Sequence, residues 1–222
     1  MHDWEVLFQG VNFERLLGGL WTSFSIALVA VLFSLVVGVP LGIAAASRNR
    51  WLRGGFQVYL QAIRVLPPLV LLFVFYFYLS LVTKVNLSAY ASAITVFTLW
   101  GAAEMGDLVR GAVTSIPKHQ YESAAALGLN PVQVQLRIVV PQSVRRLLPQ
   151  AVNLVTRMIK TTSLVVLIGV VEVLKVGQQI IDVNRFEYPS AALWVYAAVF
   201  FMYFAVCYSI SKAAAVLERR LA

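Results

Sequence analysis

Cysteine is almost absent from this sequence of 222 residues: Cys207 is the only one, and it lies in an apolar run. A disulfide framework is therefore excluded. Histidine is as scarce, since His2 and His119 are the only two and stand far apart. The sequence also lacks paired carboxylates, a nucleophile beside a base and a G-x-x-x-x-G-K-[ST] phosphate loop. We therefore expect no enzyme active site, no metal site and no cofactor bound by this chain.

Charged residues are few as well, at 13%, whereas an ordinary soluble domain has about 25%. Hydrophobic residues reach 60%, and the mean hydropathy is +0.79. They form separate long runs, which is typical of an integral membrane protein rather than of a soluble domain with a larger core. The net charge of +8 then belongs to the loops, so no nucleic-acid partner is expected. The polar, acidic first residues predict no cleavable signal peptide.

Five runs reach the roughly 20 apolar residues that a helix needs to cross a bilayer. They cover residues 20–46, 56–82, 89–113, 147–171 and 191–216, the fourth with Arg157 and Lys160 inside it. Pro40 is expected to kink the first span, and Pro67 and Pro68 are expected to break the second. The sequence thus predicts an all-α integral membrane protein, with residues 1–222 as a single transmembrane domain.

Lysine and arginine are distributed unequally over the two sides of these spans. One side carries ten of them: Arg48, Arg50, Arg53, Lys118, Arg137, Arg145, Arg146, Lys212, Arg219 and Arg220. The opposite side carries four: Arg15, Lys84, Lys175 and Arg185. Because cytoplasmic loops hold the excess of positive residues, we expect the N-terminus outside and the C-terminus in the cytoplasm.

A polar segment over residues 117–141 separates the third span from the fourth and falls on the cytoplasmic side. Pro117 is expected to end the third span, and a short helix is predicted over 119–127, with Glu122 in its first turn. Gly128 has the position of a helix C-terminal glycine with positive φ. Asn130 and Pro131 then signal the start of a second helix, which is expected to stop before Pro141. The segment is therefore predicted to be a rigid helical hairpin.

Three interpretations of this hairpin are open from the residues alone. It has the length and pattern of an interfacial amphipathic hairpin that lies on lipid headgroups. A DNA-binding helix-turn-helix is disfavoured, because Arg137 is the only basic residue of the second helix. The third interpretation is a docking element for a soluble partner.

The docking interpretation gains from a resemblance to the EAA motif of ABC-importer permeases, E-A-A-x-x-x-G, nine residues, then I-x-L-P. The matching positions are Glu122, Ser123, Ala124, Gly128, Ile138 and Pro141. Ser123 replaces an alanine and Val140 a leucine. The stretches "SIPKHQYESAAALG", "IKTTSL", "VGQQI" and "AIRVLPPL" are similar to the polar amino-acid permease family, of the histidine/glutamine type, and the similarity covers essentially the whole chain.

This resemblance implies a permease subunit of a bacterial inner-membrane importer for a polar amino acid, with the type I ABC importer fold. It implies that the hairpin contains a coupling helix, with Glu122 contacting an ATPase subunit that binds ATP and Mg²⁺. The implied partners are an ATPase dimer, a second permease, identical or paralogous, and an extracytoplasmic substrate-binding protein. The alternative is a stand-alone ion-coupled secondary transporter of a small polar solute, but the two halves of the chain show no internal repeat.

Charged groups inside spans are costly and predict functional sites. Counted along ideal helices, Glu104 lies about 20 Å into the third span and Lys160 about 20 Å into the fourth. We expect them to approach each other together with Arg157, Thr161, Thr162 and Ser163. Such a cluster fits either a transient site for an amino acid, which carries both charges, or a structural ion pair between two helices.

Other charged residues are expected to serve different purposes. Arg64, Asp107 and Arg110 lie closer to the cytoplasmic face, where a structural or gating network is favoured over substrate contact. Glu172, Lys175 and Asp182 are assigned to an outer loop, which either meets a binding protein or is simply solvated.

Overall fold

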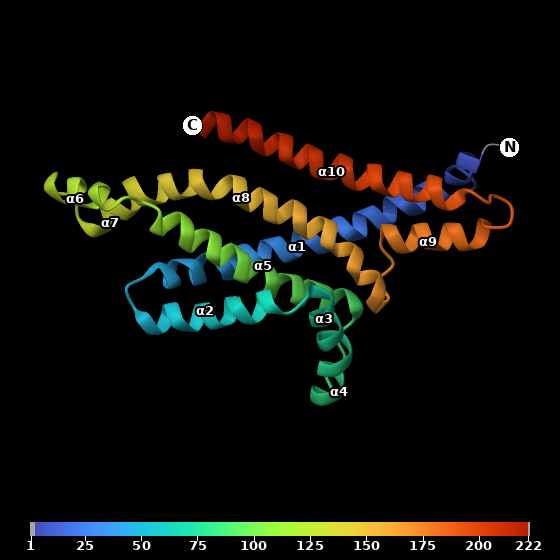
Figure 1. The fold of residues 1–222 in the computed structure, drawn as a ribbon, viewed down its shortest axis with the longest axis horizontal. Helices are drawn as coiled ribbons and strands as arrows, with labels where there is room; N and C mark the ends of the chain where they lie inside the picture. Colours follow the sequence, from blue (N-terminus) through green and yellow to red (C-terminus); the bar gives the residue numbers. More distant parts are fainter. Residues whose placement is uncertain (1–2, 222) are drawn as a thin grey trace. The chain divides into compact units, whose positions relative to one another are not determined.

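The computed structural model describes residues 3–221, and within that range every regular element is a helix (Figure 1). The predicted all-α class is therefore confirmed. The elements in chain order are η1 (Asp3–Leu7), α1 (Asn12–Ala46), α2 (Arg50–Val65), α3 (Pro68–Phe73), η2 (Val74–Tyr78), α4 (Leu79–Thr83), α5 (Ala89–Thr114), α6 (Lys118–Ala126), α7 (Pro131–Val134), η3 (Gln135–Val139), α8 (Val140–Thr161), η4 (Thr162–Ile168), α9 (Val173–Asn184) and α10 (Ala191–Leu221). Of the four η elements, η2 and η3 are π-helical, and η1 and η4 are 3₁₀-helical.

Three helical stretches of the described chain are long and apolar enough to cross a membrane: Asn12–Ala46, Pro131–Ile168 and Ala191–Arg219. The pair Arg50–Val65 and Pro68–Thr83 passes the same test only when taken together. Helix α5, with 26 residues, is also long enough, at about 39 Å. Its charged residues Glu104, Asp107 and Arg110 lower its hydropathy, so its crossing of the membrane stays a prediction.

The predicted break in the second span is present at Pro67 and Pro68. Helix α2 ends at Val65, and Leu66 takes an extended conformation, with φ −86° and ψ 126°. Leu66 precedes Pro67, and a proline ring disfavours the α-helical conformation of the residue before it, so the extended conformation is the expected one. In contrast, α1 continues through Pro40. The expected kink at Pro40 stays a prediction.

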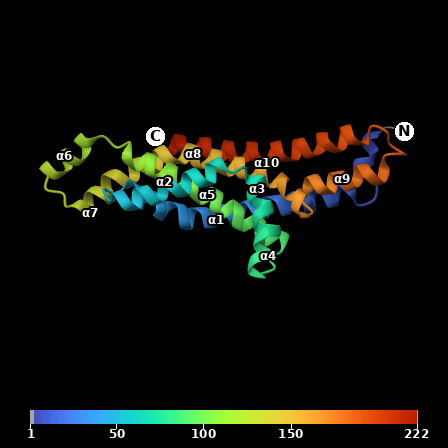
Figure 2. The same cartoon turned by 60° about the horizontal axis from the view of Figure 1, so that its bottom comes forward.

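Contacts divide the chain into two compact units, and four helices contribute to both: α1, α5, α8 and α10. Unit 1 holds the chain up to Ala30, Pro68–Phe97 and Thr156–Ile210. Its core joins η1 and the start of α1 to α9 and the start of α10, through residues such as Val6, Leu16, Val176 and Val195. Figure 2 shows α9 beside the first part of α10.

Helix α9 was missed by the sequence analysis, which placed Glu172, Lys175 and Asp182 in an outer loop. The residues Val173, Val176, Gly177 and Ile180 are buried on one face at helical spacing. A Cβ on Gly19 would come within 2.8 Å of the Val173 backbone, so glycine lets α1 approach the start of α9 this closely. The segment is therefore a packed helix rather than a solvated loop.

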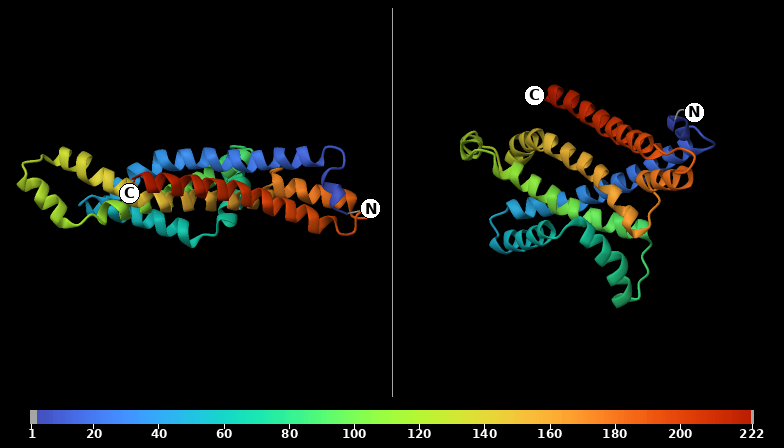
Figure 3. Two further views of the ribbon diagram at one scale, coloured as in Figure 1. Left: turned by 90° about the horizontal axis from the view of Figure 1, so that it is seen from above. Right: turned by 45° about the vertical axis from the view of Figure 1, so that its right-hand side comes forward.

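Unit 2 holds Val31–Pro67, Thr98–Val155 and the chain from Ser211. Here α1 contacts α5 closely: a Cβ on Gly38 would lie 2.8 Å from the Ala102 carbonyl oxygen, and Gly42 faces Gly106 in the same way. Small residues one turn apart permit such close packing of membrane helices. Figure 3 shows that α6 and α7 extend as a hairpin from the ends of α5 and α8.

Candidate functional site

The hairpin has the turn that the sequence predicts. Helix α6 ends at Ala126, and Gly128 takes φ +77°. No atom lies within 4 Å of where a Gly128 Cβ would be, so the glycine is required by backbone conformation rather than by space. Asn130 caps the next helix: its Oδ1 accepts from the Gln133 N–H at 2.9 Å, and the Gln133 side chain accepts from the Asn130 N–H at 3.0 Å. This reciprocal capping box fixes the direction in which α7 leaves the turn.

A small core of its own holds the hairpin together. Ala124 is buried with Ile116, Val134 and Val139, and Ile138 packs at its edge. Ser123 and Glu122 are exposed, so they face outward from this core. The sequence predicted Glu122 in the first turn of α6, but it lies beyond that turn, because the helix begins at Lys118, one residue earlier than predicted. Its Oε1 instead accepts from Lys118 Nζ at 2.8 Å, one helical turn away.

The prediction that the second helix stops before Pro141 is wrong, because the chain is helical from Pro131 to Ile168. The π-turn η3 explains this continuity. The Val140 N–H bonds the Gln135 carbonyl, five residues back, which widens the turn immediately before the proline. Proline lacks an N–H and clashes with the preceding turn of an α-helix, and a wider turn relieves both problems. The hairpin therefore passes directly into α8.

Charged side chains of α2 and α5 form one network in unit 2. The Arg64 Nε donates to Glu104 Oε1 at 3.0 Å, and its Nη2 donates to Asp107 Oδ2 at 2.8 Å. The Arg110 Nη2 donates to Asp107 Oδ1 at 2.6 Å. The network thus joins Arg64, Asp107 and Arg110, which the sequence analysis grouped, to Glu104, which it assigned elsewhere. The arginine side chains are 42% and 34% exposed, so one face of the network is open in the single chain.

The segment around Lys160 belongs to unit 1, at the change from α8 to the 3₁₀ turn η4. Three hydroxyls here donate back to their own helix: Thr161 to the Arg157 carbonyl, Thr162 to the Ile159 carbonyl and Ser163 to the Lys160 carbonyl. Their oxygens remain available as acceptors. The predicted approach of Glu104 to this segment stays a prediction, because Glu104 belongs to unit 2.

Glu172 occupies a site that the sequence analysis missed. Its side chain is fully buried, and its carboxylate accepts from the N–H groups of Leu174 and Lys175, at the start of α9. The hydroxyls of Ser23 and Tyr203 bond the same carboxylate at 3.1 and 3.2 Å. Burial raises the pKa of the Glu172 carboxyl, although these four bonds favour its ionised form. The helical spacing after Glu172 was the sequence signal for this N-terminal cap.

Comparison with known sequences identifies one family. The family described as "Binding-protein-dependent transport system inner membrane component" matches residues 38–222. The chain is 31% identical over 218 residues to the L-cystine transport system permease protein TcyB of Bacillus subtilis, covering 98% of this chain and 91% of that protein. It is 32% identical to the probable glutamine ABC transporter permease protein GlnP of Bacillus subtilis, covering 96% and 98%. The glutamate transport system permease protein GluD of Corynebacterium glutamicum is also 32% identical, covering 93% of this chain and 74% of that protein.

Two solved structures share the fold. The crystal structure of an amino acid ABC transporter with histidines has a chain that matches with a TM-score of 0.83 at 22% identity, covering 94% of both chains. An inward-facing structure of the MetNI methionine ABC transporter matches with a TM-score of 0.73 at 19% identity, covering 95% and 97%. The chain therefore shares the fold of these two chains of ABC transporters.

Proposed function

Since the chain belongs to the family of binding-protein-dependent transport system inner membrane components, we propose that it is the permease subunit of an ABC importer for a polar amino acid. The observation that carries this proposal is the similarity over almost the full length to permeases named for cystine, glutamine and glutamate. Each of these substrates is a free amino acid with a polar side chain or group. The chain is a multi-pass inner-membrane protein, and we place its N-terminus outside.

The motor is assigned to another chain. The sequence has no phosphate loop, and the described residues contain no group of His, Cys, Asp or Glu that fits a metal ion. ATP and Mg²⁺ are therefore assigned to a partner ATPase, which works as a dimer. The remaining partners are a second permease subunit and an extracytoplasmic binding protein, because one such chain supplies only part of a pathway.

The hairpin is assigned as the element that contacts the ATPase. Its buried core and its reciprocal cap make it rigid, while Glu122 and Ser123 are exposed on its outer face. A rigid element transmits a displacement without deforming. Its continuity with α8 through η3 gives that displacement a direct route into a long helix. The shape of the hairpin is then assigned to Ala124, Gly128, Ile138 and Pro141. Contact with the ATPase is assigned to Glu122.

The open face of the Arg64 network supports an assignment to the pathway or to the interface with the second permease. Charges at membrane depth face protein or water rather than lipid. Because Arg64 and Arg110 are partly exposed in the single chain, something other than lipid must cover them in the membrane. We therefore assign Arg64, Asp107 and Arg110, with Glu104 as a fourth member, to a gate whose ion pairs rearrange during transport.

Substrate contact is assigned to the Lys160 segment. The Lys160 side chain is exposed, and its ammonium suits the carboxylate of an amino acid. The hydroxyl oxygens of Thr161 and Ser163, whose protons bond backbone carbonyls, suit the ammonium group of the same molecule. Arg157 and Glu104 are further candidates for the same pathway. The change from α-helix to 3₁₀ turn at Thr162 is typical of a functional hinge.

The proposal is tested by isolating the chain from its native membrane in mild detergent and identifying what accompanies it. We expect an ATP-binding subunit in an equal amount, together with this chain alone or with a paralogous permease. ATP hydrolysis by that complex should rise when the binding protein and its amino acid are added. A chain that comes alone, even under gentle conditions, would contradict the assignment.

A further inference from the structure

Aromatic side chains gather on the surface around η1 and the start of α1. Trp4 meets Phe8 edge to face, with 6.1 Å between the ring centroids, and Phe8 stacks on Phe13 at 5.4 Å. The three residues are 43%, 61% and 39% exposed, in that order. A contiguous exposed patch of this kind marks a contact with a membrane or with another molecule. We call these three residues the N-terminal aromatic cluster.

The cluster continues an exposed face of α1. Leu17, Trp21 and Leu28 are exposed and follow Phe13 at the spacing of one helical face. After Arg15, α1 contains no charged residue. Since α1 is long and apolar enough to cross a membrane, this exposed and uncharged face is suited to lipid. The cluster therefore extends a surface suited to lipid around the N-terminal end of the helix.

Exposed aromatic residues also lie at the start of α10. Trp194 and Tyr196 are in its first two turns and are exposed. The Ser190 N–H donates to Asp3 Oδ2 at 2.9 Å, so this start lies beside η1 (Figure 1). Two helices that are long and apolar enough to span the membrane thus carry exposed tryptophan at the same end. Tryptophan and tyrosine are enriched where a span passes through the lipid headgroups.

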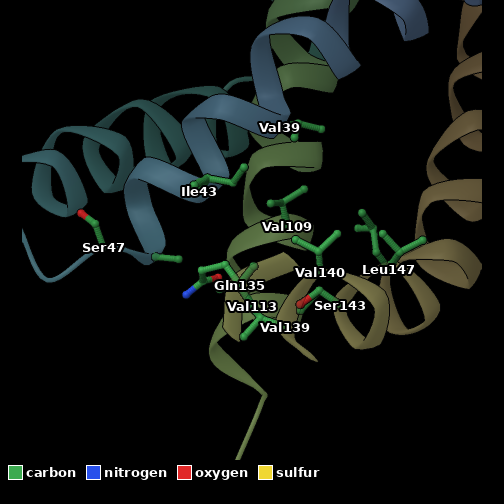
Figure 4. A pocket seen from close by; sticks show the side chains of 13 residues that line it. Val39, Ile43, Ser47, Val109, Val113, Gln135, Val139, Val140, Ser143 and Leu147 are labelled. Carbon is green, nitrogen blue, oxygen red and sulfur yellow. The ribbon is translucent and has the colours of Figure 1, made fainter. Parts of the chain in front are cut away.

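The other end of α1 has no such rings. The stretch 35–46 contains no aromatic residue, and those of α1 all fall within 13–33. The last turns of α1 instead face a cavity of about 510 Å³ in unit 2, where Figure 4 shows the aliphatic side chains of Val39, Ile43 and Val109. None of the residues that line this cavity is aromatic. The rings are therefore concentrated toward one membrane surface, rather than being spread wherever α1 needs apolar side chains.

The polar side chains of η1 lie away from the cluster. Asp3 accepts hydrogen bonds from the N–H and the hydroxyl of Ser190. Asp3 and Glu5 both interact electrostatically with Tyr188, which is buried in the core of unit 1. Val6 is fully buried in the same core. One side of η1 is thus fastened to the protein, and the other side presents the exposed rings.

We propose that the N-terminal aromatic cluster is an interfacial anchor, in which Trp4, Phe8 and Phe13 lie among the headgroups and upper acyl chains of the lipid. Because Val6 and Asp3 tie η1 to the rest of unit 1, the anchor holds this end of α1, α9 and α10 at a fixed depth. The assignment to the outer membrane surface rests on the orientation given under the proposed function. The contact with lipid does not depend on that orientation.

The test measures spin-label depth by electron paramagnetic resonance, with the intact transporter complex in vesicles of phosphatidylethanolamine and phosphatidylglycerol. Cys207, the only cysteine of the chain, is replaced by alanine, and Phe8→Cys or Phe13→Cys supplies the labelled position. The complex with Cys207→Ala alone gives the background from partner chains. Oxygen dissolves in lipid, whereas a polar nickel chelate stays in water. We expect the ratio of oxygen to nickel collisions at both positions to exceed that of the control by at least about threefold. The control is Asp182→Cys, at an exposed acidic position of α9.

A second variant tests the anchor itself. Trp4→Ala should lower the ratio at Phe8→Cys about twofold, because an aromatic ring at the headgroup level contributes to anchoring. Trp51→Ala, at an exposed tryptophan of α2, is the matched control and should leave the ratio unchanged.

Three results would overturn the proposal. The first is a ratio at the cluster no higher than at the control position, whether or not the binding protein then shields the labels. The second is shielding from both reagents, which would identify an interface with the second permease. The third is a ratio that Trp4→Ala does not change. ATPase content is scored in the same samples, so a failure of the proposed function is seen separately from a failure of the anchor.

Discussion

Arg64 and Asp107, which lie on different helices, are joined by a hydrogen bond of 2.8 Å between Arg64 Nη2 and Asp107 Oδ2. The same guanidinium also bonds Glu104, one helical turn before Asp107, so a single arginine of α2 holds two carboxylates of α5. With Arg110 included, the network has two positive and two negative side chains. Such a balance lets charges persist in a weakly polar environment, where an unpaired one would be costly.

Replacing Arg64 should therefore affect the two carboxylates together. We expect Arg64→Met to lower the free energy of unfolding by about 1 kcal/mol, near the low end for bonds to charged groups, because the side chain is 42% exposed. Thermal unfolding in detergent measures this loss. In the background of Glu104→Gln and Asp107→Asn, the same replacement should cost much less. If Arg64→Met lowered the free energy of unfolding equally in both backgrounds, the network would not act as a unit.

Glu122→Arg should detach the ATPase without unfolding the chain. The pair of Glu122 with Lys118 is largely exposed and is worth at most about 0.5 kcal/mol, so thermal stability should hardly change. The charge reversal on the proposed docking face should weaken ATPase binding by about tenfold or more. Pull-down of the ATPase with the purified permease measures this effect. Glu187→Arg, at another exposed glutamate, is the control and should bind normally; normal binding by Glu122→Arg would remove the docking assignment.

Gly128→Ala should strain the turn of the hairpin. A residue with a Cβ at φ +77° costs about 1 kcal/mol, although there is space for the added atom. We expect faster hydrogen exchange in α6 and weaker ATPase binding. Gly111→Ala is the matched control, because Gly111 lies in α5 with equal space around its Cβ position, and alanine favours a helix there. Identical exchange in the two variants would mean that the turn does not govern hairpin rigidity.

Glu172 should make stability depend on pH. Burial raises the pKa of its carboxyl above the ordinary 4.5, so below pH 4.5 the group is protonated in both the folded and the unfolded chain. As pH rises through the raised value, the unfolded chain loses the proton more readily, and the folded state becomes relatively less stable. Between pH 4.5 and pH 8, the melting temperature of the wild type should therefore fall relative to that of Glu172→Gln. A difference that stays constant between these pH values for Glu172→Gln would refute the raised pKa of its carboxyl.

The parts of the fold that the sequence predicted well depend on local signals. Asn130 with Gln133, Pro131 at the first helical position and Gly128 are all read within a few residues, and the capping box and the positive φ follow from them. Long apolar runs likewise predicted α1 and α10. The EAA pattern then indicated a use for the hairpin that its amphipathic sequence alone left open.

The parts of the fold that the sequence analysis missed depend on contacts between distant residues. The burial of Glu172 arises from Ser23 and Tyr203, which are 149 and 31 residues away, and no local pattern announces them. The passage of the helix through Pro141 depends on the π-turn η3, which a rule based on proline in ordinary α-helices does not foresee. The contact of Arg64 on α2 with Glu104 was not foreseen either, because the broken second span hid this neighbour from a count along straight helices, whereas the approach of Glu104 to Lys160 stays a prediction.

The most direct test is uptake of labelled polar amino acids by proteoliposomes that contain the permease, its ATPase and its binding protein. We predict accumulation that requires ATP inside the vesicles, vanishes without the ATPase and drops at least about tenfold in Lys160→Met, whose missing ammonium leaves the substrate carboxylate unpaired. Lys84→Met, outside the assigned pathway, should transport normally. Accumulation driven by an ion gradient with no ATPase present would contradict the account at its centre.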